Sequence, residues 1–181
     1  MKQKISESIE IPQGIDCEIK ENTIICKKGP LALSRLINHN LIRAKIQDNK
    51  IMLYCDAGNK KQYKIIKAYI AHIKNMFAGL ANPYVYTLEA VNVHFPMSLK
   101  VDKDKLIISN FLGEKTPRFA KILPNVNVEV KMPKITIISA DKEAAGQTAA
   151  NFEKATKIRN RDRRIFQDGI FITGKPGRNT T

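Results

Sequence analysis

Residues 42–55, IRAKIQDNKIMLYC, contain two runs of alternating apolar and polar side chains around a short polar turn. Alternation with a period of two predicts strands that each bury one face, and Gln47-Asp48-Asn49 predicts the turn that joins them into a hairpin. Apolar residues then recur at helical spacing, at Tyr63, Ile66, Ile70, Ile73 and Phe77. Gly79 is predicted to end this helix. The basic unit of the fold is therefore a set of strands followed by one amphipathic helix.

The same order of elements returns 84 residues later. At this offset Lys50-Ile51-Met52-Leu53 aligns with Lys134-Ile135-Thr136-Ile137, and Ile11-Pro12 aligns with Phe95-Pro96. Lys28-Gly29 also aligns with Leu112-Gly113, and Gln62-Tyr63 with Gly146-Gln147. Because a single offset of 84 residues aligns all four pairs of segments without a gap, we predict two tandem copies, over about 8–82 and 92–173. The expected domains are residues 1–82 and 83–181, the second with a basic tail at 174–181.

Each copy is predicted to be α+β, with an antiparallel sheet packed on one helix. In the first copy, strands are expected at 17–19, 23–26 and 31–33, before the hairpin at 42–55. In the second copy they are expected at 98–101, 106–109, 126–130 and 135–139. A helix from about Asp141 to Arg159 follows, with Asp141 as its N-cap. Residues 84–93 alternate in hydrophobicity and are expected to form a strand that links the copies.

The composition excludes several classes of protein. Of the 181 residues, 43% are hydrophobic, which is typical of a globular chain and not of a disordered basic tail. No run approaches the ~20 apolar residues of a membrane span, and the polar start of the chain is unlike a secretory signal. Cys17, Cys26 and Cys55 do not suggest a disulfide framework. We therefore expect buried thiols and a reducing, cytoplasmic compartment.

The charge favours a polyanionic partner. The chain carries 31 Lys and Arg against 17 Asp and Glu, a net charge of +14, which is typical of nucleic-acid-binding proteins. Residues 1–82 hold 14 basic and 7 acidic residues and residues 83–181 hold 17 and 10, so each half is +7. However, six of the eight arginines lie in the second half. Since arginine binds phosphate in a bidentate manner, nucleic-acid contacts are expected mainly there.

The strongest local signal is the basic run at 157–166, KIRNRDRRIF. From Lys154 to Arg178 there are eight basic and two acidic residues, a local charge of +6. A dense arginine run beside an aromatic residue and a glycine-rich tail indicates a segment that contacts RNA. A solvated charged run at a helix end is the alternative. Asp162 is expected to pair with a neighbouring arginine and orient it.

Three other segments allow two interpretations each. Gln147 and Asn151 share one face of the small-sided helix start, either as neutral contacts to phosphate and sugar or as solvated amides. The turn at 110–118 is either a second contact loop or a wide hairpin turn. The lysine stripe of the first helix favours a solvated face over a phosphate-tracking surface. It consists of Lys60, Lys64, Lys67 and Lys74.

The predicted RNA-binding residues are charged or amide side chains near these segments of the second half. They are Lys115, Arg118, Lys121, Lys142, Gln147, Asn151, Lys157, Arg159, Arg161, Arg163, Arg164, Lys175 and Arg178. We predict no catalytic residue, cofactor or metal site. His39, His72 and His94 lack the spacing of metal ligands, and the cysteines form no Cys-X-X-Cys pair.

Four motifs carry a family resemblance. They are His94-Phe95-Pro96, the segment NFLGEK at 110–115, GQTAAN at 146–151 and RDRRIFQDGI at 161–170, and HIKNM at 72–76 agrees with them. Over residues 8–173 the chain resembles the archaeal form of the large-subunit ribosomal protein six family, which is named nine in eukaryotes.

The resemblance implies a duplicated α+β protein that binds large-subunit ribosomal RNA and catalyses nothing. It further implies that the protein lies near the sarcin–ricin loop region and the stalk base, close to the site where translational GTPases bind. Its other expected partners are neighbouring large-subunit ribosomal proteins. The alternative is a free-standing RNA-binding module or RNA chaperone. An RNA-modifying enzyme is a third class, for which the sequence offers no cofactor motif.

Overall fold

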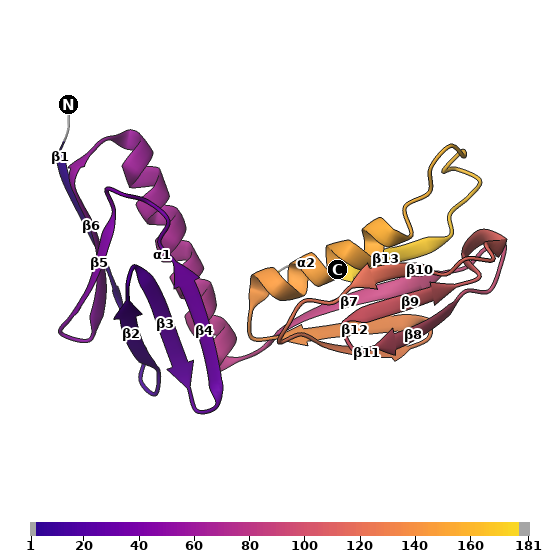
Figure 1. The fold of residues 1–181 in the computed structure, drawn as a ribbon, viewed down its shortest axis with the longest axis horizontal. Helices are drawn as coiled ribbons and strands as arrows, with labels where there is room; N and C mark the ends of the chain where they lie inside the picture. The colour runs from indigo at the N-terminus through magenta and orange to yellow at the C-terminus, as the bar shows by residue number, and fades with distance from the viewer. Residues whose placement is uncertain (1–2, 178–181) are drawn as a thin grey trace. The chain divides into compact units, whose positions relative to one another are not determined.

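The chain divides into two compact units, Met1–Asn82 and Pro83–Thr181 (Figure 1). The computed structural model describes residues 3–177. Within these residues each unit combines antiparallel strands with one α-helix, which confirms the predicted α+β class. Each unit contains two sheets, however, where one was expected. In the described part of the chain, no helix is long and apolar enough to cross a membrane.

The first unit consists of strands that form two three-stranded sheets around one long helix. In chain order it contains β1 (Gln3–Glu10), β2 (Asp16–Lys20), β3 (Thr23–Lys28), β4 (Leu31–Leu36), β5 (Arg43–Gln47), β6 (Lys50–Gly58) and α1 (Lys60–Ala81). β6 lies between β1 and β5 in one sheet, and β3 lies between β2 and β4 in the other. The predicted hairpin is β5–β6, in which Ile46 pairs with Ile51.

α1 closes the core of the first unit. Ile51 and Leu53 of β6 are fully buried together with Ile66 and Ile73 of α1, and Ile24 of β3 brings the second sheet into the same cluster. Strand side chains alternate with a period of two and helix side chains with a period of 3.6, so both elements turn an apolar face to this core. Full burial of each such side chain stabilises the fold by about 2 kcal/mol.

The start and the end of α1 are set by different physical effects. Asn59 caps the first turn in a capping box. The prediction that Gly79 ends the helix is wrong, because Gly79 is buried within a helix that continues to Ala81. Proline disfavours helical backbone in the residue before it, and Asn82, which precedes Pro83, is extended with φ of −139°. Pro83 therefore sets the end of the helix.

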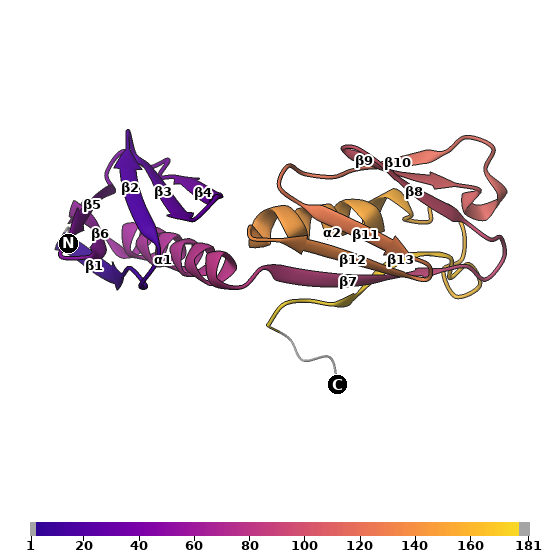
Figure 2. The ribbon, with the colours of Figure 1, turned by 90° about the horizontal axis from the view of Figure 1, so that it is seen from below.

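The second unit repeats this plan and adds a strand. Its elements are β7 (Tyr84–Val91), β8 (Ser98–Asp102), β9 (Lys105–Ser109), a short 3-10 turn (Phe111–Gly113), β10 (Arg118–Lys121), β11 (Asn127–Lys131), β12 (Lys134–Ser139), α2 (Lys142–Ala155) and β13 (Gly169–Gly174). One sheet has the order β10-β9-β8 and the other β11-β12-β7-β13, and Figure 2 shows the two one above the other.

The expected strand in residues 84–93 is confirmed as β7, but it is part of the second unit and not only a link between the copies. β7 pairs with β12 on one side and with β13 on the other. Its residues Tyr86, Leu88 and Ala90 are buried at every second position. The alternation seen in the sequence therefore belongs to an interior strand of the second unit.

The strands of the two units correspond in order, but not at a single offset. β5 and β6 start at 43 and 50, and β11 and β12 start at 127 and 134, an offset of 84 that matches Ile51 with Ile135. β2 and β3 start at 16 and 23, while β8 and β9 start at 98 and 105, an offset of 82. The gapless alignment is thus wrong for the early strands. The two extra residues of the second unit lie between β9 and β11.

α2 begins where it was predicted to begin and ends earlier. Asp141 caps it by accepting a hydrogen bond from the Glu143 N–H at 2.8 Å. The prediction that the helix continues to Arg159 is wrong, because α2 ends at Ala155. The buried hydroxyl of Thr156 accepts a hydrogen bond from the Ile170 N–H at 2.8 Å. This contact ties the helix end to β13, and the chain leaves the helix there.

Packing explains why the residue at position 146 is small, because α2 approaches the sheet closely at Gly146. A Cβ at Gly146 would lie 2.9 Å from the buried Tyr86 hydroxyl of β7. Replacing a helical Gly with Ala ordinarily stabilises a helix by about 1 kcal/mol. We expect Gly146→Ala to show no such gain alone and to recover it in a Tyr86→Phe background. Urea midpoints of the single and double variants measure this, and equal effects in both backgrounds would contradict it.

Candidate nucleic-acid interface

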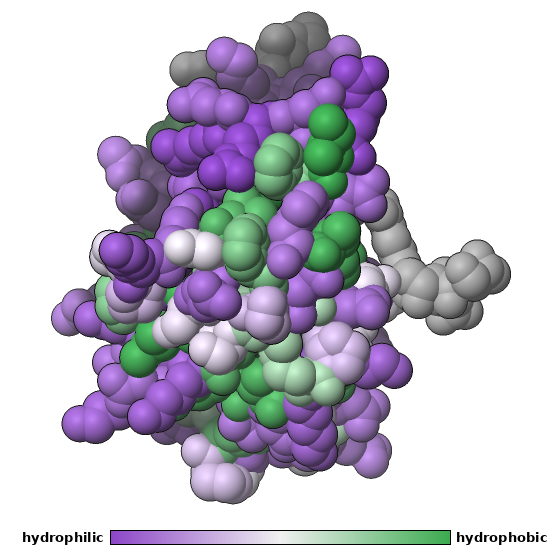
Figure 3. Space-filling model, turned by 90° about the vertical axis from the view of Figure 1, so that its right-hand side faces the viewer, coloured by the Kyte–Doolittle hydropathy of each residue, from purple (hydrophilic) through white to green (hydrophobic). Residues whose placement is uncertain are grey.

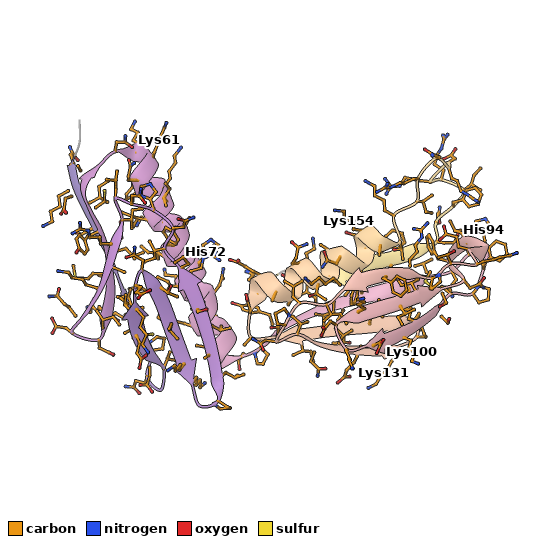
Figure 4. All side chains as sticks on the ribbon, viewed as in Figure 1. Lys61, His72, His94, Lys100, Lys131 and Lys154 are labelled. Carbon is orange, nitrogen blue, oxygen red and sulfur yellow. The ribbon has the colours of Figure 1, made fainter. Side chains whose placement is uncertain are left out.

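The cationic segment, defined as residues 154–164, runs from the last turn of α2 into the non-helical chain before β13. Lys154 lies at the C-terminal end of α2 (Figure 4), where the helix dipole favours a positive charge. The other cationic residues of the segment are all exposed. They are Lys157, Arg159, Arg161, Arg163 and Arg164. Because the helix stops at Ala155, these residues lie on a loop and not along one helix face.

A buried carboxylate holds this loop to the rest of the second unit. Asp168 is 2% exposed, and its Oδ1 accepts hydrogen bonds from the backbone N–H groups of Val93 (2.7 Å) and His94 (2.9 Å). Its Oδ2 lies 2.6 Å from Nδ1 of the His94 ring. Burial by itself raises the pKa of Asp168, but the hydrogen bonds from His94 and Val93 outweigh burial and hold that pKa below its ordinary value. Asp168 is therefore ionised and anchors the loop.

Stacked side chains connect His94, the partner of Asp168, to the cationic segment. The His94 ring stacks on Phe166 with 4.8 Å between ring centroids, and the Arg161 guanidinium lies 4.7 Å from the centroid of the Phe166 ring. Arg164 donates to Asp162 at 3.0 Å, which confirms the predicted pairing of this aspartate with an arginine. The hydrogen bonds from Arg164 lower the pKa of Asp162. The loop is thus positioned by contacts within the protein.

Four cations of the segment have no such contact among the described residues, namely Lys154, Lys157, Arg159 and Arg163. Within residues 3–177, Lys157, Arg159 and Arg163 form no ion pair. Lys157 and Arg159 line both a cleft of about 1150 Å³ beside β13 and a cleft of about 420 Å³ beside β10, and Lys154 lines both as well. An unpaired cation at an open cleft can bind phosphate without first breaking a salt bridge. These residues are therefore the candidates for phosphate contacts in the segment.

Arg118, in contrast, is engaged inside the protein. Its guanidinium forms a bidentate pair with Glu114, with Nε 2.7 Å from Oε2, and donates to the Ala155 carbonyl at 2.9 Å. It also lies 4.4 Å from the centroid of the Phe111 ring. The hydrogen bond from Arg118 lowers the pKa of Glu114. Arg118 thus fastens the loop before β10 to the end of α2.

The two predicted amides contact each other and the protein. The Gln147 Nε2 donates to the Asn151 Oδ1 at 3.0 Å, so the two side chains share one face of α2. The Asn151 Nδ2 donates to the Lys121 carbonyl at 3.0 Å. Asn151 therefore connects α2 to β10, and Gln147 is the more exposed of the two amides.

The remaining predicted residues lie at several places in the second unit, and Lys142 is at the opposite end of α2 from the cationic segment. Lys115, Lys121 and Lys175 are exposed, in the loop before β10, at the end of β10 and directly after β13. Lys142 is half-buried, with its Nζ 5.5 Å from the centroid of the Tyr84 ring. Arg178 lies outside the described residues. Within them, no cluster of His, Cys, Asp and Glu could hold a metal ion.

The sequence prediction omitted one cation and several exposed apolar side chains. Lys154 lines both clefts, and Phe119 and Phe171 line one each while remaining 58% and 39% exposed. Figure 3 shows that hydrophobic residues also reach the surface among hydrophilic ones at the end of the second unit that faces the viewer. Alternation in Arg118-Phe119-Ala120-Lys121 was the available signal, because a buried Ala120 turns Phe119 outward.

One lysine of the α1 stripe is already in an ion pair, so the stripe has fewer unpaired charges than its sequence suggests. Lys67 pairs with Glu7 at 2.6 Å, and its Nζ lies 5.3 Å from the centroid of the Tyr63 ring. That ion pair raises the pKa of Lys67. Lys60, Lys64 and Lys74 are exposed.

Comparisons with known proteins agree with the motifs of the second unit. A family profile described as "Ribosomal protein L6" matches residues 95–169, which contain β8 to α2 and the cationic segment. The whole chain is similar to "Large ribosomal subunit protein uL6" of Methanothrix thermoacetophila, with 42% identity over 175 residues, 97% of this chain and 99% of that protein. The chain therefore belongs to the ribosomal protein L6 family and is a structural, non-enzymatic constituent of the ribosome.

Proposed function

We propose that the second unit binds large-subunit ribosomal RNA near the sarcin–ricin loop region and the stalk base. There it supports the region of the cytoplasmic ribosome where translational GTPases bind, beside neighbouring large-subunit proteins. The observation that carries this proposal is the cationic segment, which Asp168 anchors and in which Lys157, Arg159 and Arg163 have no ion-pair partner among the described residues. The family and its motifs support the site on the ribosome.

The predicted residues take different roles in this interface. Lys157, Arg159 and Arg163 bind phosphate directly, and Arg161 and Arg164 bind it with the donors that Phe166 and Asp162 leave free. Further contacts come from Lys154 at the start of the segment and, outside the segment, from Lys115, Lys121, Lys142, Gln147, Lys175 and Arg178. Arg118 and Asn151 position β10 against α2, since their polar groups already contact the protein.

RNA contacts are expected to concentrate in residues 110–121 and 142–178, because exposed lysines and arginines and most residues that line the two clefts lie in these ranges. The test is to pellet large subunits through a high-salt cushion, irradiate them with ultraviolet light and map the peptides of this protein that crosslink to RNA. The protein should remain with the subunit, and most crosslinks should fall in these two ranges. A majority of crosslinks in residues 1–82 would contradict the distribution, and loss of the protein in high salt would contradict stable assembly.

A further inference from the structure

Two cysteines of the first unit face each other across a strand pair. Cys17 of β2 pairs with Cys26 of β3, and their Sγ atoms lie 3.1 Å apart. The strands are joined by the two-residue turn Glu21-Asn22, and the pairing has no register shift. Hydrogen-bonded and non-hydrogen-bonded pairs alternate away from such a turn, so the pair of Cys17 and Cys26 is the second non-hydrogen-bonded one. At these positions the two backbones approach most closely.

That geometry suits a disulfide. Opposite residues of a non-hydrogen-bonded pair have Cα atoms about 4.5 Å apart, and disulfides span Cα separations of about 4.4–6.8 Å. The sulfur atoms need to close only from contact distance to a bond of about 2.04 Å. Neither strand has to change its register for this.

The two thiols differ in access and in acidity. Cys26 is fully buried, while Cys17 is half-buried. The hydrogen bond between them lowers the pKa of Cys17 and, together with burial, raises the pKa of Cys26. Since the thiolate is the reactive form, Cys17 is the thiol that meets an oxidant and Cys26 is its neighbour for the second step.

We propose that Cys17 and Cys26 form an oxidant-sensitive dithiol that closes to a disulfide when the protein meets a peroxide. The Cys17 thiolate attacks one oxygen of hydrogen peroxide, the O–O bond breaks, and Cys17 becomes a sulfenic acid with release of hydroxide, which takes up the thiol proton as water. The Cys26 sulfur then attacks the Cys17 sulfur, the S–O bond breaks, and a second water leaves. Two thiols are oxidised to one disulfide, and one peroxide is reduced to two waters.

Cys55 provides an internal control. It is buried in β6 of the other sheet, and within the described residues no hydrogen bond joins its sulfur to another cysteine. The disulfide would therefore consume two of the three cysteines in this chain and leave Cys55 as a free thiol. Its formation would not involve any residue of the cationic segment.

The test uses the full chain, treated with hydrogen peroxide, blocked with iodoacetamide and digested with trypsin without reduction. Trypsin cleaves after Lys4, Lys20 and Lys27, so the disulfide joins peptide 5–20 to peptide 21–27. We expect the count of free thiols to fall from three to one, and dithiothreitol to restore three. The Cys55→Ser variant should give the same linked peptides, and Cys17→Ser should give none and leave Cys26 in the thiol form.

Three results would overturn the proposal. They are an unchanged count of three thiols, a disulfide that includes Cys55, and oxidation of Cys26 in Cys17→Ser at the rate seen in the unaltered protein. The decisive measurement is made on the unaltered chain, so it does not depend on whether a variant folds. None of these results bears on the RNA interface, which lies in the other unit.

Discussion

Replacing Arg161, Arg163 and Arg164 together with Ala is expected to weaken binding to a large-subunit rRNA fragment roughly 100-fold at moderate salt, if each arginine contributes about 1 kcal/mol. The three side chains are exposed on the loop that Asp168 anchors, so their removal changes charge more than fold. Each phosphate contact releases counterions, with a slope of log affinity against log salt of roughly −0.7 per phosphate for single strands. The variant should therefore flatten this slope by up to about 2. Filter binding over a salt series measures both quantities.

A matched control removes three positive charges from the other unit. Lys61, Lys64 and Lys74 lie on α1, are exposed and form no ion pair within residues 3–177. Changing all three to Ala lowers the net charge by the same amount, so any general effect of charge appears equally in both variants. We expect the control to retain most of its affinity. Loss of binding in the control together with normal binding in the arginine variant would place the RNA on the first unit.

Asp168→Ala is expected to destabilise the second unit by about 3 kcal/mol, because it removes the charged acceptor of two backbone N–H groups and of the His94 ring. The carboxylate accepts from Val93 and His94 and is 2% exposed, so water cannot easily replace it. Asp168→Asn retains one acceptor oxygen but no charge, and should cost less. Urea unfolding followed by circular dichroism measures both variants. A midpoint equal to that of the unaltered protein would show that the anchor contributes nothing.

The same anchor gives an acid-dependent contribution to stability. The pKa of Asp168 in the folded chain is lowered from an ordinary value of 3.8, so the folded state favours the ionised form. Its contribution is present above about pH 4 and is lost as the pH falls through the lowered pKa. The difference in urea midpoint between the unaltered protein and Asp168→Ala should therefore be large at pH 6 and smaller at pH 3. A difference that grows on acidification would contradict this sign.

Local patterns predicted most of the secondary structure. The alternating runs around Gln47-Asp48-Asn49 became β5 and β6, and the helical spacing from Tyr63 to Phe77 lies within α1. Periodicity is a property of neighbouring residues, so it can be read without knowledge of the fold. Of the two wrong helix ends, that of α1 is set by the nearby Pro83, while that of α2 depends on a distant part of the chain. The Thr156 hydroxyl accepts a hydrogen bond from the Ile170 N–H of β13, and this contact ties the end of α2 to that strand. No sequence pattern near Thr156 predicts the contact.

The candidate interface divides in the same way. The number and positions of the arginines can be read from the sequence, and they predicted that residues 157–164 contact RNA, because the charge of a side chain follows from its residue type. Which arginines are free could not be predicted, since pairing depends on residues that the fold brings together. Arg118 meets the carbonyl of Ala155, 37 residues away, and so acts within the protein, while Arg163 keeps its charge unpaired among the described residues.

The sequence by itself determined the α+β class, the repeated order of elements, the family and the basic character of the second half. Each of these depends on residue type and spacing along the chain. Only the tertiary structure decided that β7 is an interior strand, that Asp168 meets His94 across 74 residues, and that Cys17 meets Cys26. The physical reason is that hydrogen bonds, ion pairs and sulfur contacts act over a few ångströms, and the chain must fold before distant residues come within that range.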